Sequence, residues 1–203
     1  MTIEKGGSWG APGPLPVNGA VARSDAEVRS LVEAARRANE PVRPIGLLGG
    51  DLCRTLGGPS SEARLHSAEA MTFSVDIGSV LIDGLLHWFA AHLVARRSWW
   101  HGRLVGVMNA QFLGSWDVAP RSHPGDGRLD VVDADPALGE RLKARRRLPV
   151  GSHLPHPDIQ VRSVRAWQTD FVPPLDVWLD GEKVARAAKV AVRVEPDALT
   201  VVV

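Results

Sequence analysis

The chain has 203 residues, which suits one large domain, or a modest one plus a fragment, with a buried core. Its net charge of +1 gives no strong field toward nucleic acid or an anionic membrane. A single cysteine, Cys53, excludes an internal disulfide framework and fits a reducing compartment. There is no cationic-then-apolar leader and no run of about 20 apolar residues, so we expect a cytoplasmic protein without a nucleic-acid partner, whose membrane contact is peripheral.

The first third of the chain predicts a small α/β unit that follows a flexible arm. Residues 1–20 are expected to form the arm, since glycine and proline are frequent there. Ser24 offers an N-cap, and apolar residues then recur at helical spacing. The apolar run 42–48 predicts a buried strand that ends in Gly49-Gly50. We therefore assign residues 21–66 to a partial α/β domain.

From residue 67 onward the pattern changes to β-structure. Short apolar stretches alternate with polar residues, and Asp-Gly pairs at 83–84 and 180–181 indicate two-residue hairpins. One helix is expected over 136–147. The expected strands cover 85–94, 103–109, 128–132, 159–169, 175–179, 188–194 and 199–203. So many short strands favour an antiparallel β-sandwich over 67–203, and the fold class is α+β.

The glycine-rich turn after the first strand carries a chemical signal. Gly49 and Gly50 would let backbone N–H groups approach a phosphate, and Asp51 would hold a Mg²⁺ that bridges phosphate oxygens. The same residues also suit a purely structural turn between a strand and a helix. By itself the turn leaves both interpretations open.

Three later motifs are equally ambiguous when taken singly. Asp180-Gly181-Glu182 reads as a type I′ hairpin turn, and Asp126-Gly127 reads as a turn that opens a strand. Asn109 ends an expected strand, where it either binds the neighbouring backbone or faces a site.

In their order along the chain these motifs resemble the bacterial diacylglycerol kinase, or lipid kinase, family of the NAD kinase/diacylglycerol kinase-like superfamily. The matching residues are Gly49-Gly50-Asp51, Asn109 with Gly114, Asp126-Gly127-Arg128-Leu129-Asp130-Val131 after Pro120, and Asp180-Gly181-Glu182. The resemblance covers most of residues 42–203. It implies an antiparallel β-sandwich preceded by a remnant of the nucleotide-binding domain, and hence a truncated member of the family.

The resemblance also implies an activity, ATP-dependent phosphoryl transfer to the hydroxyl of a diacylglycerol-like lipid or another small-molecule alcohol. Glu182 would be the general base, supported by Asp180, and Asp51 would hold the metal ion of the ATP–Mg²⁺ cofactor. The residues implied to contact ATP are Gly49, Gly50, Asp51, Thr55 and Asn109. A further Mg²⁺ site is implied at Asp126, with the backbone carbonyls of His123 and Arg128.

The sequence departs from the family at one motif. Leu52 and Cys53 stand where the family has glycine and threonine, and Thr55 lies two residues late. Because the Cβ of Leu52 would stand in a phosphate loop, ATP is expected to bind weakly or not at all. The alternative is therefore a non-catalytic relative that binds a lipid, a nucleotide or a protein partner. Whether the protein is an enzyme, and whether a homodimer forms, stays open.

Two other patterns have competing interpretations. His153 and His156 have a spacing seen in metal sites but lack a clear third ligand, so a connector is the simpler interpretation. The aromatic residues 99–101 and the cations of the expected 136–147 helix suit phospholipid headgroups, but they equally suit hairpin aromatics and cations that complement a helix dipole.

Overall fold

The computed structural model describes residues 9–203. Of the expected N-terminal arm, residues 1–8 lie outside the described part. Residues 9–20 pack against the rest of the chain: β1 (Ala11–Pro12) pairs with the start of β4 (Met71–Ile82), and Leu15 is buried. The division of the chain into three domains stays a prediction.

The N-terminal α/β unit consists of two short parallel strands joined by a helix. The strands are β2 (Ala20–Ala22) and β3 (Ile45–Leu47), and the helix is α1 (Asp25–Ala38), capped by the Ser24 hydroxyl. After β3 the chain turns into the short helices α2 (Asp51–Thr55) and α3 (Glu62–Leu65).

The remainder is built almost entirely from strands. They are β4, β5 (Leu85–Phe89), β6 (His92–Arg96), β7 (Leu104–Met108), β8 (Phe112–Leu113), β9 (Trp116–Asp117), β10 (Leu129–Ala134), β11 (Ile159–Val164), β12 (Ala166–Leu179) and β13 (Glu182–Val202). The helix α4 (Leu138–Arg147) and a 3₁₀ turn, η1 (Leu148–Val150), connect β10 to β11.

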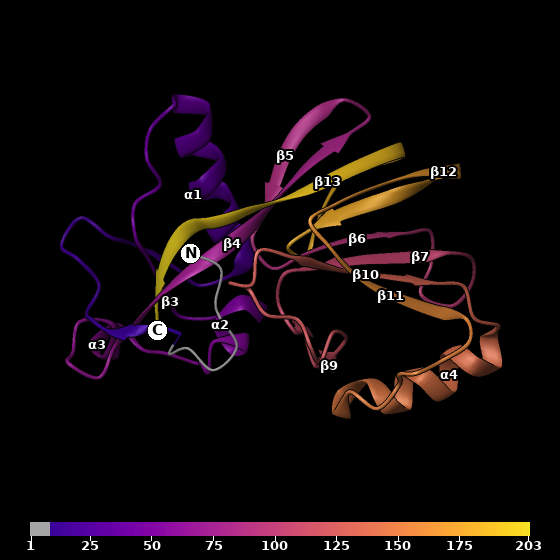
Figure 1. Cartoon of the computed structure of the whole chain (residues 1–203), viewed down its shortest axis with the longest axis horizontal. Helices are drawn as coiled ribbons and strands as arrows, with labels where there is room; N and C mark the ends of the chain where they lie inside the picture. The colour runs from indigo at the N-terminus through magenta and orange to yellow at the C-terminus, as the bar shows by residue number, and fades with distance from the viewer. Residues whose placement is uncertain (1–8) are drawn as a thin grey trace.

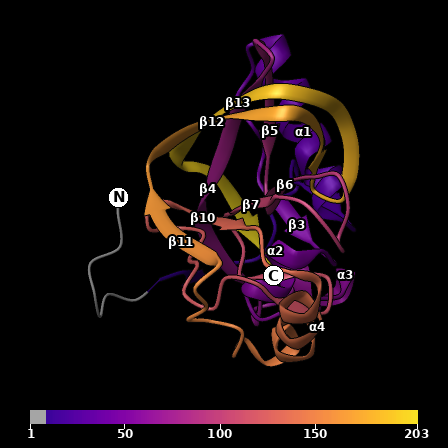
Figure 2. The ribbon, with the colours of Figure 1, turned by 90° about the vertical axis from the view of Figure 1, so that its right-hand side faces the viewer.

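One antiparallel sheet folds over on itself to make the sandwich. Its strand order is β1-β4-β13-β12-β6-β7-β10-β11, with β5 paired to β4. Figure 1 shows β4, β5, β13 and β12 above β6, β7, β10 and β11, and Figure 2 shows the same layers end-on. The core between the layers includes Phe89, Leu93, Val107, Phe171 and Leu179, each almost fully buried.

The long strand β13 joins the sandwich to the α/β unit. Its C-terminal residues Val201 and Val202 pair in parallel with β3, while its earlier residues pair with β4 and β12. A second core lies on this side, where Val28, Val32, Leu47 and Leu52 are buried. The expected α+β class with an antiparallel sandwich is therefore confirmed.

Both expected hairpin turns are present. Asp83-Gly84 joins β4 to β5, and Asp180-Gly181 joins β12 to β13, with positive φ at all four residues. The strand expected over 85–94 was wrong as a single element, because Ala90 and Ala91 interrupt it between β5 and β6. The two C-terminal strands expected separately are one strand, β13, with an irregularity between Glu195 and Leu199.

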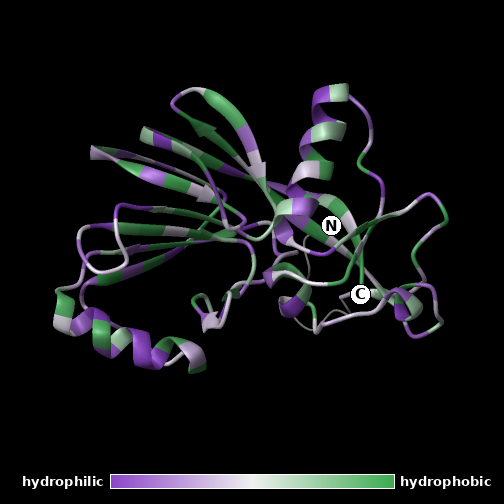
Figure 3. Ribbon diagram, turned by 180° about the vertical axis from the view of Figure 1, so that it is seen from behind, coloured by the Kyte–Doolittle hydropathy of each residue, from purple (hydrophilic) through white to green (hydrophobic). Residues whose placement is uncertain are grey.

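The helix α4 forms as expected, but its exposed face is not polar throughout. Leu138 and Leu142 are exposed, while Arg141 is buried. Figure 3 shows green and purple residues alternating along this helix, which lies at the edge of the molecule away from α1. Within residues 9–203, none of the helices is both long and apolar enough to span a bilayer.

Candidate functional site

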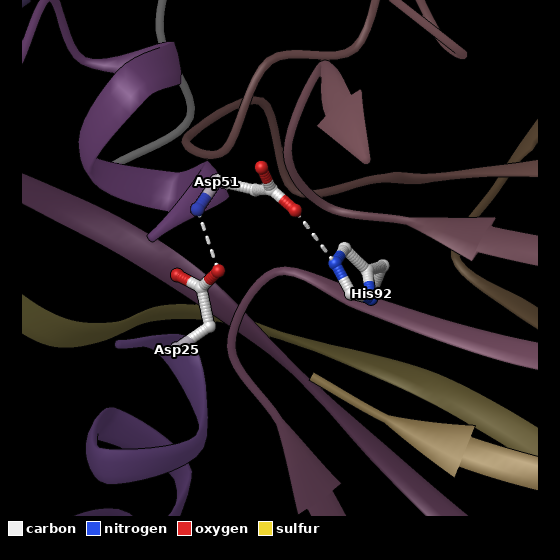
Figure 4. A group of neighbouring side chains, drawn as sticks. All are labelled: Asp25, Asp51 and His92. Atoms are coloured by element: carbon white, nitrogen blue, oxygen red, sulfur yellow. Dashed lines mark hydrogen bonds and ion pairs between the residues drawn. The ribbon is translucent and has the colours of Figure 1, made fainter. Parts of the chain in front are cut away.

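A cluster of ionisable side chains lies where the α/β unit meets the sandwich. Asp25 comes from the start of α1, Asp51 from the start of α2 and His92 from the start of β6, and the three point toward one another (Figure 4). Their nearest ligand-type atoms lie within 4.8 Å of one another. We call Asp25, Asp51 and His92 the Asp–His cluster.

The Asp25 carboxylate accepts hydrogen bonds from backbone N–H groups of the glycine-rich turn. Its two carboxylate oxygens accept the N–H groups of Asp51 and Leu52, at 2.6 and 3.1 Å. A Cβ on Gly50 would lie 2.5 Å from the Asp25 carboxylate, and a Cβ on Gly49 would lie 2.7 Å from the carbonyl oxygen of Arg23. Both glycines therefore permit the close approach of the segment that carries Asp25.

Asp51 and His92 form a half-buried ion pair. The Asp51 carboxylate contacts His92 Nε2 at 3.0 Å and accepts the Gly114 N–H at 2.9 Å. Burial alone would raise the pKa of Asp51, but the hydrogen bonds from His92 and Gly114 outweigh burial and hold that pKa below its usual value. Burial likewise opposes the charged form of His92, yet the bond to Asp51 and the charge of Asp180 raise its pKa above the usual value.

The Asp-Gly-Glu hairpin supplies two carboxylates with different environments. Asp180 is buried, and its oxygens accept the N–H groups of Ala90, Ala91 and His92 at 2.9, 2.8 and 3.1 Å. The bonds from Ala90 and Ala91 account for the break between β5 and β6, because these donors cannot also serve a strand ladder. Asp180 is thereby fixed as a structural acceptor.

Glu182 remains accessible from solvent. Its side chain is 62% exposed and pairs with Arg29, whose own side chain is 9% exposed and lies 3.9 Å from Asp180. Glu182 is thus joined to the Asp–His cluster through Arg29 and Asp180. An accessible carboxylate beside a buried guanidinium is suited to accept a hydrogen bond from an alcohol.

The glycine-rich turn does not fit an ATP phosphate in this structure. The N–H groups that would face the phosphate are bonded to Asp25, which already supplies the negative charge. Leu52 is fully buried in the core beside α1, and the expectation that its Cβ weakens ATP binding stays a prediction. The obstacle to phosphate is the Asp25 carboxylate. A metal ion at the Asp–His cluster would have to displace the same hydrogen bonds.

Thr55 and Asn109 are both engaged within the protein. The Thr55 hydroxyl donates to the Asp51 carbonyl at 2.8 Å and accepts the Gln111 N–H at 3.1 Å. The Asn109 amide is fully buried and donates to the carbonyls of Asp76 and Ala90, each at 2.8 Å. Asn109 thus links the end of β7 to β4 and to the break between β5 and β6. The N–H group of Ala90, in that break, binds Asp180.

The loop before β10 folds as a set of local hydrogen bonds, apart from the Asp–His cluster. Asp126 accepts the Arg128 N–H at 2.9 Å, and the His123 carbonyl accepts the N–H groups of Gly125 and Asp126. Burial raises the pKa of Asp126, with Asp130 and Asp76 adding to the effect. A Mg²⁺ site at Asp126 and the carbonyls of His123 and Arg128 stays a prediction.

Sequence reasoning found Asp51, Asp180 and Glu182 but missed Asp25, Arg29 and His92. Asp25 had a readable signal, since an acidic residue follows the N-cap directly after a strand. Arg29 lies one turn farther along the same helix. His92 had no such signal, because its role depends on the pairing of β6 with β7 and β12.

An apolar cavity of about 380 Å³ lies between α4 and the sheet. Its lining is dominated by aliphatic and aromatic side chains, with Arg141, Arg145 and His153 as the polar members. The β8–β9 hairpin borders both this cavity and the Asp–His cluster: Leu113 and Trp116 line the cavity, while the Gly114 N–H binds Asp51.

The chain is similar to three solved structures from Bacillus anthracis strain Sterne. One, described provisionally as a diacylglycerol kinase, superposes with a TM-score of 0.66 at 16% identity, covering 90% of this chain and 76% of that chain. A second with the same description gives 0.66 at 15% identity, covering 91% and 77%. A third, described as a diacylglycerol kinase, gives 0.53 at 17% identity, covering 90% and 74%. At these identities the likeness is one of fold.

No curated protein matches the chain. A family model described as the YegS C-terminal NAD kinase beta sandwich-like domain matches residues 66–203, which is more than half of the sequence. The matched residues contain the sandwich, the cavity, His92 and the Asp-Gly-Glu hairpin. The chain therefore belongs to the family of the YegS C-terminal NAD kinase beta sandwich-like domain.

Proposed function

We propose that this protein recognises a lipid, holding its apolar tail in the cavity beneath α4 and its hydroxyl end near the Asp–His cluster and Glu182. The observation that carries the proposal is that the cavity and the cluster share one face of the sheet. His92 and Val94 lie two residues apart on β6, and Val94 lines the cavity. Residues two apart in a strand face the same side and are separated by about 7 Å.

The neighbouring strand β7 extends the same face of the sheet. Met108 on β7 pairs with His92 and lines the cavity, as does Gly106, which pairs with Val94. A lipid tail that enters the cavity would therefore direct its polar end along β6 and β7 toward His92. Each methylene buried there would contribute about 0.8 kcal/mol to binding.

Phosphoryl transfer to the lipid hydroxyl is the second candidate function. It is favoured by the joining of Asp51, Asp180 and Glu182 through His92 and Arg29, and by membership of a kinase family. The N–H groups of Asp51 and Leu52 are already bonded to Asp25, and this weighs against phosphoryl transfer. The same bonds support the expectation that ATP binds weakly. In this candidate function Glu182 accepts the proton of the alcohol, and its exposed carboxylate beside Arg29 supports that role.

Lipid binding is tested by narrowing the cavity from α4. Ala144 lines the cavity, so Ala144→Phe should lower the affinity for a dioctanoylglycerol probe at least tenfold, measured by native mass spectrometry or calorimetry. Ala38→Phe, at the exposed end of α1, is the matched control and should bind as the wild type does. If both variants bound dioctanoylglycerol as tightly as the wild type, the cavity would not be the lipid-binding site.

Phosphoryl transfer is tested separately with labelled ATP–Mg²⁺ and the same lipid. Glu182→Gln should abolish any labelled lipid product, because the amide cannot take up a proton. Glu62→Gln is the matched control: Glu62 is 63% exposed and pairs with Arg23, much as Glu182 pairs with Arg29. Lipid binding without a labelled product in the wild type would select the non-catalytic alternative.

A further inference from the structure

One polar side chain in the wall of the cavity under α4 lacks a hydrogen-bond partner. His153 is 3% exposed, and within residues 9–203 neither of its ring nitrogens makes a hydrogen bond. The two arginines of the same wall are engaged: Arg141 donates to backbone carbonyls, and the Arg145 guanidinium lies 4.8 Å from the centre of the Trp100 ring. Because an unpaired buried polar group costs free energy, the His153 ring indicates a polar atom of a ligand in the cavity.

The turn that carries His153 is held tightly against the sheet. After η1, the Gly151 N–H bonds the Leu148 carbonyl at 3.1 Å, and Gly151 has a φ of +63°. A Cβ on Gly151 would lie 2.7 Å from the Asp117 carboxylate, so glycine lets this turn approach β9 closely. The imidazole two residues later is thereby fixed in the cavity wall.

The His153 ring is neutral near pH 7. Burial lowers the pKa of His153 below its usual value, and the nearby Val118 backbone and the charge of Asp117 oppose burial only in part. A neutral imidazole offers one N–H donor and one acceptor nitrogen. It gives a carboxylate or a phosphate no opposite charge, so the ring is suited to an uncharged oxygen.

His153 lies at the end of the cavity nearer the Asp–His cluster. Its neighbour Val118 packs against Met108, and Met108 pairs with His92 across strands β7 and β6. A lipid whose hydroxyl lies near His92 would therefore place the bonds next to its glycerol unit, and not its chain ends, beside His153.

We propose that His153 donates a hydrogen bond to an ester carbonyl of the bound lipid, so that the cavity selects ester-linked over ether-linked chains. The inference rests on the proposed function, which puts the hydroxyl near the Asp–His cluster and the chains under α4. Between these two parts, the ester carbonyl is the strong acceptor that an acylated glycerol offers. An ether oxygen is a weaker acceptor and would leave the N–H of His153 poorly paired.

The test compares dioctanoylglycerol with its dioctyl ether analogue, which keeps the hydroxyl and replaces both ester groups by ether links. Wild type should bind the ester about tenfold more tightly in calorimetry, as expected for one hydrogen bond. His153→Leu, with a side chain of similar size, should bind the two probes alike. His66→Leu removes an exposed histidine beyond α3 and is the matched control, which should keep the preference.

Two further variants separate recognition of the ester from packing. Ala144→Phe narrows the cavity from α4 and should weaken both probes by the same factor, so the ratio of the two affinities stays. His153→Gln supplies an amide N–H in place of the imidazole donor and should recover part of the preference. A purely structural role for His153 would change both affinities and leave their ratio as in the wild type.

A measurement on the wild type does not depend on the folding of any variant. With isotope-labelled ester carbonyls, dioctanoylglycerol bound to the protein should show a carbonyl infrared band at lower frequency than in an alkane solvent. An unshifted band, equal affinities of wild type for the two probes, or a preference that His153→Leu retains would overturn the role of His153 and leave lipid binding intact. Absence of binding for both probes would overturn the proposed function, and this inference with it.

Discussion

At the scale of single residues, Asp25 decides what the glycine-rich turn can do. Gly49 and Gly50 would let a phosphate approach the backbone of the turn, but the Asp25 carboxylate already accepts the N–H groups of Asp51 and Leu52. The same bonds cap α2, whose N-cap residue Gly50 has no side chain to do so. Asp25 therefore stabilises the fold and closes the turn at once.

Removal of the Asp25 carboxylate should reveal both that Asp25 stabilises the fold and that it keeps other anions out of the turn. In Asp25→Ala, the N–H groups of Asp51 and Leu52 lose their acceptor, and the free energy of unfolding should fall by about 1–3 kcal/mol. Because two donors and the helix end become free, inorganic phosphate should raise the melting temperature of this variant more than that of the wild type. Ser30→Ala, on the exposed side of α1, provides the control. An unchanged response to phosphate would show that Asp25 does not close the turn.

The pH dependence of stability follows from the same residue. Burial, and then the charge of Asp180, raise the pKa of Asp25 from 3.8 to about 6. Between these values the folded state retains a proton that the unfolded chain has released, so this stabilising contribution is present at low pH and lost as the pH rises. The stability of wild type relative to Asp25→Asn should fall by roughly 2–3 kcal/mol from pH 4 to pH 7 in denaturant titrations. A difference that stays constant or grows with pH would contradict the assignment.

Asn109 is expected to stabilise the fold. Its amide donates to two buried carbonyls from different segments, Asp76 and Ala90. Asn109→Ala leaves both acceptors without a donor and should lower the free energy of unfolding by roughly 2–4 kcal/mol. Chemical denaturation measures the loss, with Asn39→Gly at the exposed left-handed C-cap of α1 as a control that should be nearly neutral. A loss below about 1 kcal/mol would favour a binding role for the amide instead.

At the scale of elements, turns were easier to predict than strand limits. An Asp-Gly pair specifies a tight hairpin through its own backbone preferences, and both such pairs form one. The run 85–94 gave no sign of its interruption, because the cause is the Asp180 carboxylate about 90 residues later in the chain. Likewise, β13 continues past its irregular part because the Asp76 carboxylate accepts the Asp197 N–H at 2.9 Å.

Two glycines in neighbouring elements should differ in the kind of damage that alanine causes. A Cβ on Gly84 meets nothing within 4 Å, so Gly84→Ala should cost only about 1 kcal/mol of backbone strain. A Cβ on Gly78 would lie 2.1 Å from the ring of Phe89, so Gly78→Ala should cost about 1–3 kcal/mol from overpacking. Phe89→Leu should recover part of the loss at Gly78 and none at Gly84. If Phe89→Leu recovered the same share of the stability loss in Gly78→Ala and in Gly84→Ala, the predicted contact between the new Cβ at residue 78 and the Phe89 ring would be refuted.

At the scale of the whole molecule, β13 makes the two parts of the chain one structure. It pairs with β12 and β4 in the sandwich and with β3 in the α/β unit. Unfolding of either part should therefore disrupt the other.

A single unfolding transition is the expected result. Tryptophan fluorescence reports mainly on the sandwich, while the thiol of Cys53 becomes reactive only when the buried α2 segment opens. The two probes should give the same denaturant midpoint, and Gly78→Ala should shift both equally. Thiol exposure at a lower midpoint would show that the α/β unit unfolds by itself.

The sequence by itself determined the α+β class, the two Asp-Gly hairpins, the α1 and α4 helices and the approximate place of most strands. These depend on local periodicity and turn chemistry, which neighbouring residues carry. Only the tertiary structure decided that Asp25 and His92 meet Asp51, that Leu52 points into the core, and that a cavity lies under α4. Each of these depends on contacts between segments far apart in the chain, which strand pairing and packing establish and local pattern does not encode.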